Sequence, residues 1–140
     1  MTNIHATLIS FQNKGILFRG KSGSGKSDLA LRFIMAHNAV LVADDRVNLS
    51  VQKNVLLGAA PPEIQGKLEI RGVGIAHFPF LAQIEICLCV DLIDNLADID
   101  RLPNPEKIDL QGVSIDKLVL YPFESSATYK IIAKISGIIS

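Results

Sequence analysis

Short apolar runs, separated by polar or glycine-containing segments, predict alternating strands and helices in the first half of the chain. Ala6, Leu8 and Ile9 indicate a first strand, and Gly15–Arg19 a second that leads directly into a glycine-rich loop. From Lys26 to about Ala36, apolar residues recur every three or four positions, at Leu29, Ala30, Phe33 and Ile34. This is the period of an amphipathic helix. We therefore expect a strand, a glycine loop and a helix in succession.

The next runs have the length and composition of strands. Residues 39–43 are continuously apolar, as expected of a strand covered on both faces, and are followed by Asp44 and Asp45. A strand pair is expected from Arg46 to Leu57 with a turn near Lys53, and a further strand from Leu68 to Ile70. Residues 84–90 indicate another buried strand, whose direction the pattern leaves open.

The C-terminal segment has the period of a helix. One helical face carries the apolar residues Ala127, Ile131, Ile132, Ile135 and Ile138. Ser125 or Ser126 is a suitable N-cap for the first turn. We expect a closing helix from about residue 126 to 138. Because no repeat or linker interrupts the chain, the pattern predicts one α/β domain over residues 1–140, with helices flanking a mixed β-sheet.

Composition and charge exclude several classes of protein. With 140 residues, 49% of them hydrophobic and 20% charged, the chain is long enough to bury a core without metal or disulfide cross-links. Fourteen basic and fourteen acidic residues cancel, so nucleic acid is not an expected partner. The longest apolar run is far shorter than the ~20 residues that span a bilayer. Since residues 1–7 lack the features of a signal peptide, we expect a cytoplasmic protein.

Two cysteines, Cys87 and Cys89, lie two residues apart in a segment with strand character. This spacing places both side chains on one face and orients them poorly for a mutual disulfide. We expect buried, reduced thiols. The three histidines are scattered and there is no second cysteine pair, so the spacing does not indicate a metal site built from these residues.

The strongest motif is Gly20-Lys21-Ser22-Gly23-Ser24-Gly25-Lys26-Ser27, which has the G-x-x-x-x-G-K-[ST] spacing of a phosphate-binding loop. Glycines let backbone N–H groups approach a phosphate without obstruction from side chains. Lys26 begins the predicted helix and can reach the terminal phosphates, while the Ser27 hydroxyl can ligate Mg²⁺. The preceding strand and following helix provide the required context. We predict that Gly20 and residues 22–27 bind a nucleoside triphosphate.

Adjacent carboxylates at Asp44 and Asp45 emerge where a predicted strand ends. Two acids at that position could have separate roles in phosphoryl transfer, one near Mg²⁺ and one near the attacking nucleophile. They could instead cap the next segment or balance Arg46. Asp91, at the end of a buried strand, is a rival to Asp45 as the magnesium acid.

Three segments together resemble the ordered motifs of HPr kinase/phosphorylase: residues 20–27, Leu41-Val42-Ala43-Asp44-Asp45-Arg46-Val47, and Leu68-Glu69-Ile70-Arg71-Gly72-Val73-Gly74-Ile75. The first motif is shared by many nucleotide-binding folds, whereas the other two are specific to this family. The resemblance extends over nearly the whole chain. It implies a fold similar to the C-terminal domain of HPr kinase and to the nucleotide-binding fold of phosphoenolpyruvate carboxykinase.

The resemblance also implies an activity and roles for individual residues. Members of the family transfer phosphate from ATP, with Mg²⁺, to a serine of the phosphocarrier protein HPr, and many reverse the reaction with inorganic phosphate. Asp44 would be the base that accepts the serine proton, with His5 beside it and Lys26 at the phosphates. Ser27 and Glu69 would hold Mg²⁺, with Asp45 close by. The resemblance further implies a homo-oligomer, since family members assemble as hexamers.

Two departures from the longer members of the family follow from the same comparison. The family's active-site histidine already falls at His5, so we expect the short, single-domain form. The basic segment that longer members carry after the third motif is reduced to residues 77–82 or missing. Reverse phosphorylase activity and metabolite control are therefore open.

Two other functions remain as alternatives. A small-molecule kinase would share the phosphate loop, but such enzymes usually close an arginine-bearing lid, and only Arg71 and Arg101 lie beyond Arg46. A nucleotide-dependent switch would bind the triphosphate without transferring it. Binding of ATP without phosphorylation of an acceptor would favour the switch.

Overall fold

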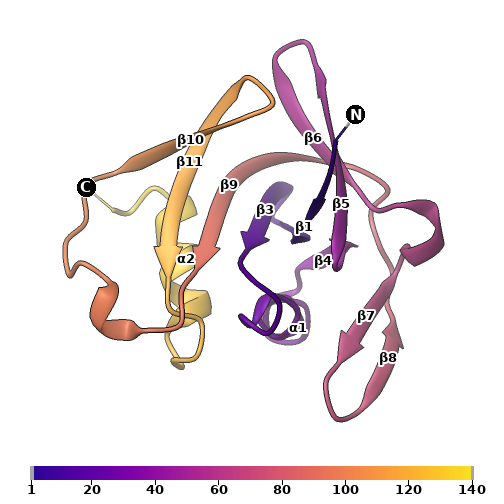
Figure 1. Cartoon of the computed structure of the whole chain (residues 1–140), viewed down its shortest axis with the longest axis horizontal. Helices are drawn as coiled ribbons and strands as arrows, with labels where there is room; N and C mark the ends of the chain where they lie inside the picture. Colours follow the sequence, from indigo (N-terminus) through magenta and orange to yellow (C-terminus); the bar gives the residue numbers. More distant parts are fainter. Residues whose placement is uncertain (1, 140) are drawn as a thin grey trace.

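Residues 2–139 of the computed structural model form a curled mixed β-sheet with two α-helices, α1 (Lys26–His37) and α2 (Ala127–Ile135), packed against one face (Figure 1). The sheet has the order β1-β5-β6-β9-β3-β2-β4, and β11 also pairs with β9 and carries β10 on its other side. These strands are β1 (Thr2–His5), β2 (Thr7–Phe11), β3 (Lys14–Arg19), β4 (Val40–Ala43), β5 (Arg46–Gln52), β6 (Val55–Ala59), β9 (Ile84–Leu92), β10 (Glu106–Leu110) and β11 (Val113–Leu120). The α/β class expected from the sequence is confirmed.

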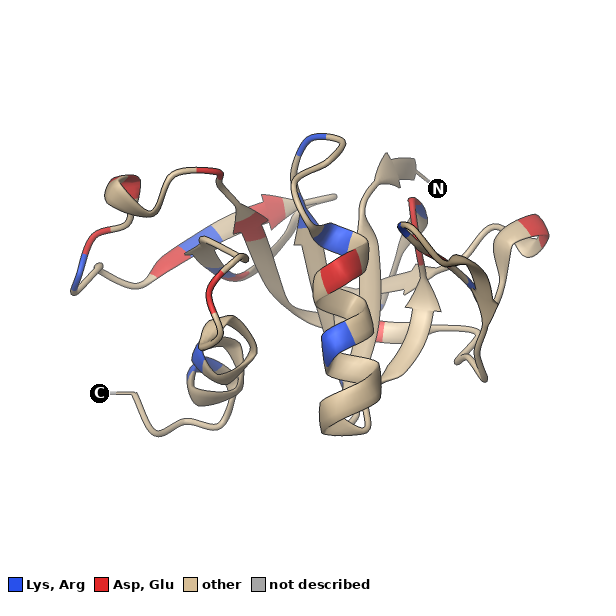
Figure 2. Ribbon diagram, turned by 90° about the horizontal axis from the view of Figure 1, so that it is seen from below, with Lys and Arg blue, Asp and Glu red and all other residues tan. Residues whose placement is uncertain are grey.

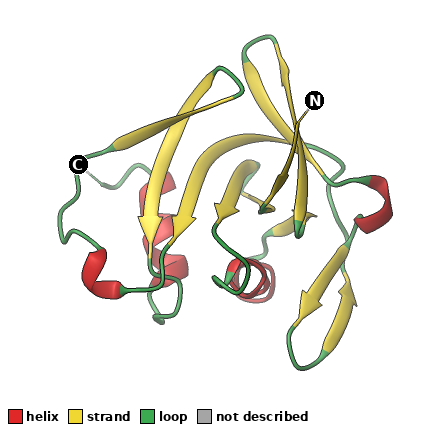
Figure 3. Ribbon diagram, in the orientation of Figure 1, coloured by secondary structure: helices red, strands yellow, loops and turns green. Residues whose placement is uncertain are grey.

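A separate antiparallel hairpin, formed by β7 (Lys67–Ile70) and β8 (Gly74–His77), projects from the main sheet (Figure 3). Short 3-10 helices at Pro62–Ile64 and Leu96–Asp98 lie in the connections. The hairpin reaches α1, against which β7 packs. This contact brings the third motif of the sequence to the same helix that begins with the glycine loop.

Most of the elements expected from the apolar pattern are confirmed. The predicted strands correspond to β2, β3, β4, β5, β6, β7 and β9, and the predicted first helix to α1. The β5–β6 turn lies where expected, and its central residues Lys53 and Asn54 have the positive φ of 51° and 64° that a tight hairpin turn requires. The open question about β9 is resolved, because β9 is parallel to both β3 and β11.

Several expectations were wrong or incomplete. The sequence pattern did not indicate β1 or the β10–β11 hairpin. The closing helix ends at Ile135 instead of Ile138, since Gly137 adopts a φ of +80° and Ile138 is exposed. Ser126 occupies the N-cap position, but its side chain makes no capping hydrogen bond.

Of the two cysteines, both free, Cys89 is buried as expected, whereas Cys87 is only partly buried.

Two apolar clusters cover opposite faces of the central strands. Ile9, Ile16 and Phe18 point toward the helices and pack with Phe33, while Leu8 and Leu17 point the other way and pack with the curled part of the sheet. Neighbouring residues of a strand face opposite sides, so a strand covered on both sides must be apolar at successive positions. This explains why all five residues of β2 are buried.

Parallel pairing of β3, β9 and β11 places their carboxyl ends on one edge of the sheet. In open α/β sheets, ligands bind outside this edge. The glycine loop follows β3 at this edge, and the turn that leads to α2 follows β11. The topology therefore identifies one edge of the molecule as the place to look for a site.

A half-buried ionic cluster joins the ends of these three strands. Arg19 at the end of β3 makes two hydrogen bonds to Asp91 of β9, from Nε at 2.8 Å and from Nη2 at 2.9 Å, and Lys117 of β11 lies 3.5 Å from the same carboxylate. Burial alone would raise the pKa of Asp91, but the hydrogen bonds and charges of Arg19, with Lys117, lower it on balance. Burial, followed by the charge of Asp91, raises the pKa of the neighbouring Cys89 thiol to about 12.

Within residues 2–139, no helix has the length and apolar character needed to cross a membrane. Figure 2 shows basic and acidic residues interspersed along the ribbon.

Replacing Phe33 by Ala should destabilise the protein strongly. Its ring is fully buried and lies 5.7 Å from the ring of Phe11 and 6.0 Å from that of Phe18. Removal of a buried phenyl group costs about 3–5 kcal/mol of unfolding free energy. Met35→Ala, on the same helix but 70% exposed, is the matched control and should change it by less than ~1 kcal/mol. Urea titrations followed by circular dichroism would measure both, and equal effects would contradict the packing described here.

Asp91→Asn should destabilise the protein in a pH-dependent way. The pKa of this carboxyl is lowered in the folded state. The ionised carboxylate therefore stabilises the fold fully above its unfolded pKa of ~3.9, and this stabilisation is lost as the pH falls through the lower pKa of the folded state. Because the cluster is only half buried, we expect a loss of about 1–2 kcal/mol at pH 7. The difference from the parent should shrink on acidification. Denaturant titrations between pH 7 and pH 3.5 would measure it, with the exposed Asp116→Asn as control; a constant difference would exclude the charge as its cause.

Candidate functional site

The glycine loop connects β3 to α1 in a conformation that only small residues permit. A Cβ on Gly20 would lie 2.4 Å from Oγ of Ser24, so the two segments of the loop can approach this closely only because residue 20 has no side chain. Gly25 precedes the helix with a φ of +100°, in the left-handed region that glycine adopts readily. Among the described residues, no side chain caps the N-terminus of α1. The first N–H groups of the helix are thus left to bind an anion.

Lys26 begins α1 and folds back across the loop. Its side chain is largely buried, and Nζ donates hydrogen bonds to the carbonyl oxygens of Gly20 at 2.7 Å and Lys21 at 3.0 Å. Burial lowers the pKa of its ammonium group, while the negative charges of Asp45 and Asp44 oppose this effect. The ammonium is therefore held at the centre of the loop, at the position where phosphate charge would need compensation.

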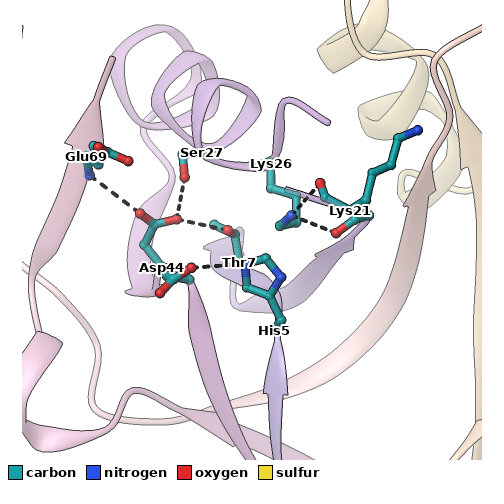
Figure 4. Close-up of polar contacts among 9 residues, drawn as sticks. His5, Thr7, Lys21, Lys26, Ser27, Asp44 and Glu69 are labelled. Atoms are coloured by element: carbon teal, nitrogen blue, oxygen red, sulfur yellow. Dashed lines mark hydrogen bonds and ion pairs between the residues drawn. The ribbon is translucent and has the colours of Figure 1, made fainter. Parts of the chain in front are cut away.

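Asp44 joins four elements through hydrogen bonds (Figure 4). Its Oδ1 accepts from Oγ of Ser27 at 2.7 Å and from Oγ1 of Thr7 at 2.9 Å, and its Oδ2 lies 3.5 Å from the backbone N of Glu69. These donors come from α1, β2 and β7, while Asp44 itself follows β4. The carboxylate is buried, and its nearest donors are neutral hydroxyls. It is therefore placed directly against the serine that ends the glycine motif.

Asp45 has a different environment from its neighbour. Its side chain is 71% exposed, its backbone has a φ of +73°, and its Oδ1 lies 3.0 Å from Nε2 of His5 (Figure 4). The resemblance places His5 beside Asp44, and this stays a prediction; the hydrogen bond of the histidine goes to Asp45, the second aspartate of the pair. Asp45 adopts its left-handed backbone between β4 and β5.

A cavity of about 380 Å³ lies in front of the loop. His5, Asp45, Glu69 and Arg71 line it on the side of β1 and β7, while residues of the loop and the first turn of α1 line its centre: Ser22, Gly23, Gly25, Lys26, Ser27 and Asp28. Asp44, Gly20 and Ser24 lie behind this surface and do not line it. The structure thus brings the predicted site residues together around one cavity, in two layers.

Asp91 does not belong to this group. It lies at the carboxyl end of β9, beside the strand that leads into the loop, but Arg19 and Lys117 already occupy its carboxylate. It makes no contact with Ser27 among the hydrogen bonds of residues 2–139, whereas Asp44 does. Asp44 and Asp45 therefore lie beside the loop and its cavity, and the assignment of Asp45 as the magnesium acid stays a prediction.

The oxygen ligands around Ser27 fit Mg²⁺ bound together with a nucleotide. Magnesium is usually held by one or two protein oxygens plus substrate phosphates and water. Ser27 and Asp44 supply such oxygens 2.7 Å apart, and Asp45 and Glu69 reach the cavity beside them. Among residues 2–139, no cluster of three or more His, Cys, Asp and Glu side chains could hold a metal by itself.

Sequence reasoning missed several residues of the site. Thr7 was seen only as part of a strand, although its hydroxyl fixes Asp44. Arg71 was named as part of the third motif without a role in the site, and it lines the cavity together with Glu69. Phe123, in the turn after β11, also lines the cavity. Only Arg71 carried a usable signal, because it lies inside the third motif.

Comparison with known families matches residues 1–136 to the family described as HPr Serine kinase C-terminal domain. Among curated relatives, the HPr kinase/phosphorylase of Streptococcus thermophilus is 38% identical over 128 residues, that of Clostridium acetobutylicum 36% over 129, and that of Mycoplasma mycoides 33% over 126. These alignments cover 84%, 85% and 81% of this chain but only 41%, 42% and 40% of the relatives. The chain thus spans about two-fifths of their length.

A solved structure, the Hpr(Ser) kinase/phosphatase from Coxiella burnetii, superimposes with a TM-score of 0.82 at 23% identity. The match covers 98% of this chain and all of the other. At this identity the likeness concerns the fold, and it agrees with the curled sheet and two helices described above. The family match, the identity to curated relatives and the shared fold all concern the segment that carries the three motifs. The chain therefore belongs to the HPr Serine kinase C-terminal domain family.

Proposed function

We propose that this chain is an ATP- and Mg²⁺-dependent protein-serine kinase whose acceptor is an HPr-like phosphocarrier protein. The observation that carries the proposal is the hydrogen bond between Ser27 and Asp44, which joins the phosphate loop to the acid pair at one cavity. Membership of a family whose curated relatives are named HPr kinase/phosphorylase supports the choice of acceptor. Because the chain spans only part of those relatives, activity and acceptor belong to the proposal.

In the proposed mechanism the phosphate loop holds the triphosphate. The backbone N–H groups of residues 22–27 bind the outer phosphates, and Lys26 compensates the charge that develops during transfer. Ser27 and Glu69, with Asp45 close by, would hold Mg²⁺, whose charge would offset that of the phosphates. Most of the rate acceleration then comes from positioning and charge stabilisation, since phosphoryl transfer requires little covalent chemistry from the protein.

Asp44 is the proposed acceptor of the serine proton. It already accepts hydrogen bonds from two hydroxyl groups, those of Ser27 and Thr7, so its carboxylate is suited in position and chemistry to receive a third hydroxyl. A base must lie within hydrogen-bond distance of the proton it removes. Ser27 would hold Mg²⁺ through its hydroxyl oxygen, and Asp44 would then offer an acceptor position to the incoming serine. His5 and Asp45 would orient the incoming serine from the other wall of the cavity.

The same geometry permits the reverse reaction, in which Asp44 returns the proton and inorganic phosphate removes the phosphoryl group.

Assembly as a homo-oligomer, a hexamer by family resemblance, remains a prediction. Small-molecule kinase activity and a nucleotide switch are the outcomes that would replace the proposal if the acceptor is not phosphorylated.

Asp44→Asn should abolish transfer of labelled phosphate from ATP to the serine of HPr. Loss of a general base lowers the rate by roughly 10²–10⁴-fold. Asp45→Asn is the matched control, because it removes the adjacent carboxylate but leaves Asp44 with Ser27 and Thr7. It should retain more activity than Asp44→Asn. If Asp45→Asn is the more damaging, the base is Asp45; if the parent binds ATP without labelling HPr, the acceptor assignment is wrong.

Lys26→Met should lower phosphotransfer by roughly 10²–10³-fold, since it removes a positive charge aimed at the transferring group. The change keeps the apolar stem, and the ammonium bonds only to backbone carbonyls, so the unfolding free energy should change little. Lys21→Met is the control, because Lys21 is exposed and pairs only with Asp94 at 3.2 Å. Steady-state assays with urea titrations would test both. Unchanged transfer by Lys26→Met would refute its assignment.

A further inference from the structure

Phe123 lies at the rim of the cavity with no role in the chemistry described above. Its side chain is 54% exposed, although it belongs to the turn between β11 and α2 and lines the same cavity as Gly25 and Lys26. A large apolar side chain exposed on the wall of a polar cavity forgoes the stabilisation that burial would give it. Other large apolar side chains are exposed as well, and Phe123 differs from Leu102 and Val73 in lining the cavity, where a ligand could contact it.

The ring lies against the phosphate loop itself. A Cβ on Gly25 would come within 3.1 Å of both Cε1 and Cζ of Phe123, which is closer than such contacts normally are. The absence of a side chain at residue 25 thus serves two purposes: it permits the positive φ at the start of α1, and it lets an aromatic ring approach the loop closely. About half of the Phe123 side chain remains exposed and can contact another group.

The turn that carries Phe123 is fixed to the helix that carries the phosphate loop. Arg32 of α1 donates a hydrogen bond from Nη2 to the carbonyl oxygen of Pro122 at 2.6 Å, and its Nε lies 3.2 Å from the carboxylate of Asp28. Tyr121 packs edge to face with Phe123, with ring centroids 5.7 Å apart at 78°. The ring is therefore held in place before any ligand arrives.

Topology separates this ring from the acidic wall. The turn follows β11 and the phosphate loop follows β3, and these strands point the same way on either side of β9. Asp44 and Glu69 come instead from β4 and β7, on the other side of the loop (Figure 1). In the proposed function the acceptor serine and the metal lie beside the acids, so the rest of a bound nucleotide would extend toward β11.

We propose that Phe123 is the platform on which the base of the nucleotide stacks. A purine base has a wide apolar face, and stacking on an aromatic side chain is favourable for any base. The inference rests on the proposed function, since it assumes that the loop binds a nucleoside triphosphate. It adds a base subsite to the phosphate site. Stacking alone distinguishes purines poorly, so ATP and GTP should depend on Phe123 to a similar degree.

The test compares two magnesium complexes, ATP and inorganic tripolyphosphate, which share the phosphates and differ in the nucleoside. In the full chain, Phe123→Ala should raise the Kd for MgATP about 10-fold, as expected for loss of one base stack, and leave that for magnesium tripolyphosphate within about 2-fold. Phe123→Tyr, which keeps the aromatic face, should bind MgATP like the parent. Isothermal titration calorimetry gives all the constants, and circular dichroism verifies that each variant is folded.

A fluorescent reporter provides an independent measurement, because the chain contains no tryptophan. In Phe123→Trp the single indole should be quenched by MgATP and by MgGTP, but not by magnesium tripolyphosphate. Leu102→Trp, at a 94% exposed position outside the cavity lining, is the matched control and should respond to none of them.

The outcomes separate this inference from the proposed function. If the parent binds tripolyphosphate and ATP, but Phe123→Ala affects neither or weakens both equally, the platform is refuted while the phosphate site stands. If the parent binds neither ligand, the nucleotide site itself is wrong and both proposals fail. Selective loss of ATP affinity, together with base-dependent quenching, supports the platform.

Discussion

The candidate site depends on the packing of α1 against the central strands. Phe33 and Leu29 fix the helix against β2 and β3 on an apolar surface that excludes water. Because β3 enters the glycine loop and α1 leaves it, that packing determines where the N–H groups of the loop point. Backbone N–H groups cannot change direction as side chains do. The geometry of an anion site made from them therefore depends on the fixed positions of β3 and α1.

Asp91 and Asp44 both lie near the loop, but their carboxylates have different hydrogen-bond partners. Asp91 faces Arg19 and Lys117, which compensate its charge and occupy its oxygens. Asp44 faces the hydroxyls of Ser27 and Thr7, which satisfy its hydrogen bonds without neutralising its charge. Hydroxyl donors can turn toward another acceptor at little cost, whereas an arginine bonded through two nitrogens cannot. Only Asp44 therefore keeps a charge available for ligand chemistry, and Asp91 stabilises the strand ends that support the loop.

Local patterns were sufficient to predict the strand, loop and helix around Lys26, the hairpin turn at Lys53, and the strand that ends at Asp44. The sequence was less informative where structure depends on distant partners. β1 and β10 have no buried residue and β11 has only Ile115 and Leu120, so these strands lack the continuous apolar character of the central strands. The hydrogen bond of His5 to Asp45 joins two strands that are distant in the sequence, and no local pattern indicates it. Phe123 is some hundred residues from the loop, and the pairing of β11 with β9 together with the bond from Arg32 to Pro122 brings them together.

The arrangement of the cavity separates interactions that hold a nucleotide from those that act during transfer. If the base stacks on Phe123 as proposed, contacts with the base would not change as the terminal phosphate moves, so stacking would stabilise the bound substrate and the transition state equally. Such uniform binding lowers KM without raising kcat. In the proposed mechanism Lys26 and the Asp44–Asp45 pair act where charge and a proton move, and interactions that strengthen only in the transition state raise kcat. On these two proposals the wall next to β11 would govern affinity, while the wall formed by β1, β4 and β7 would govern rate.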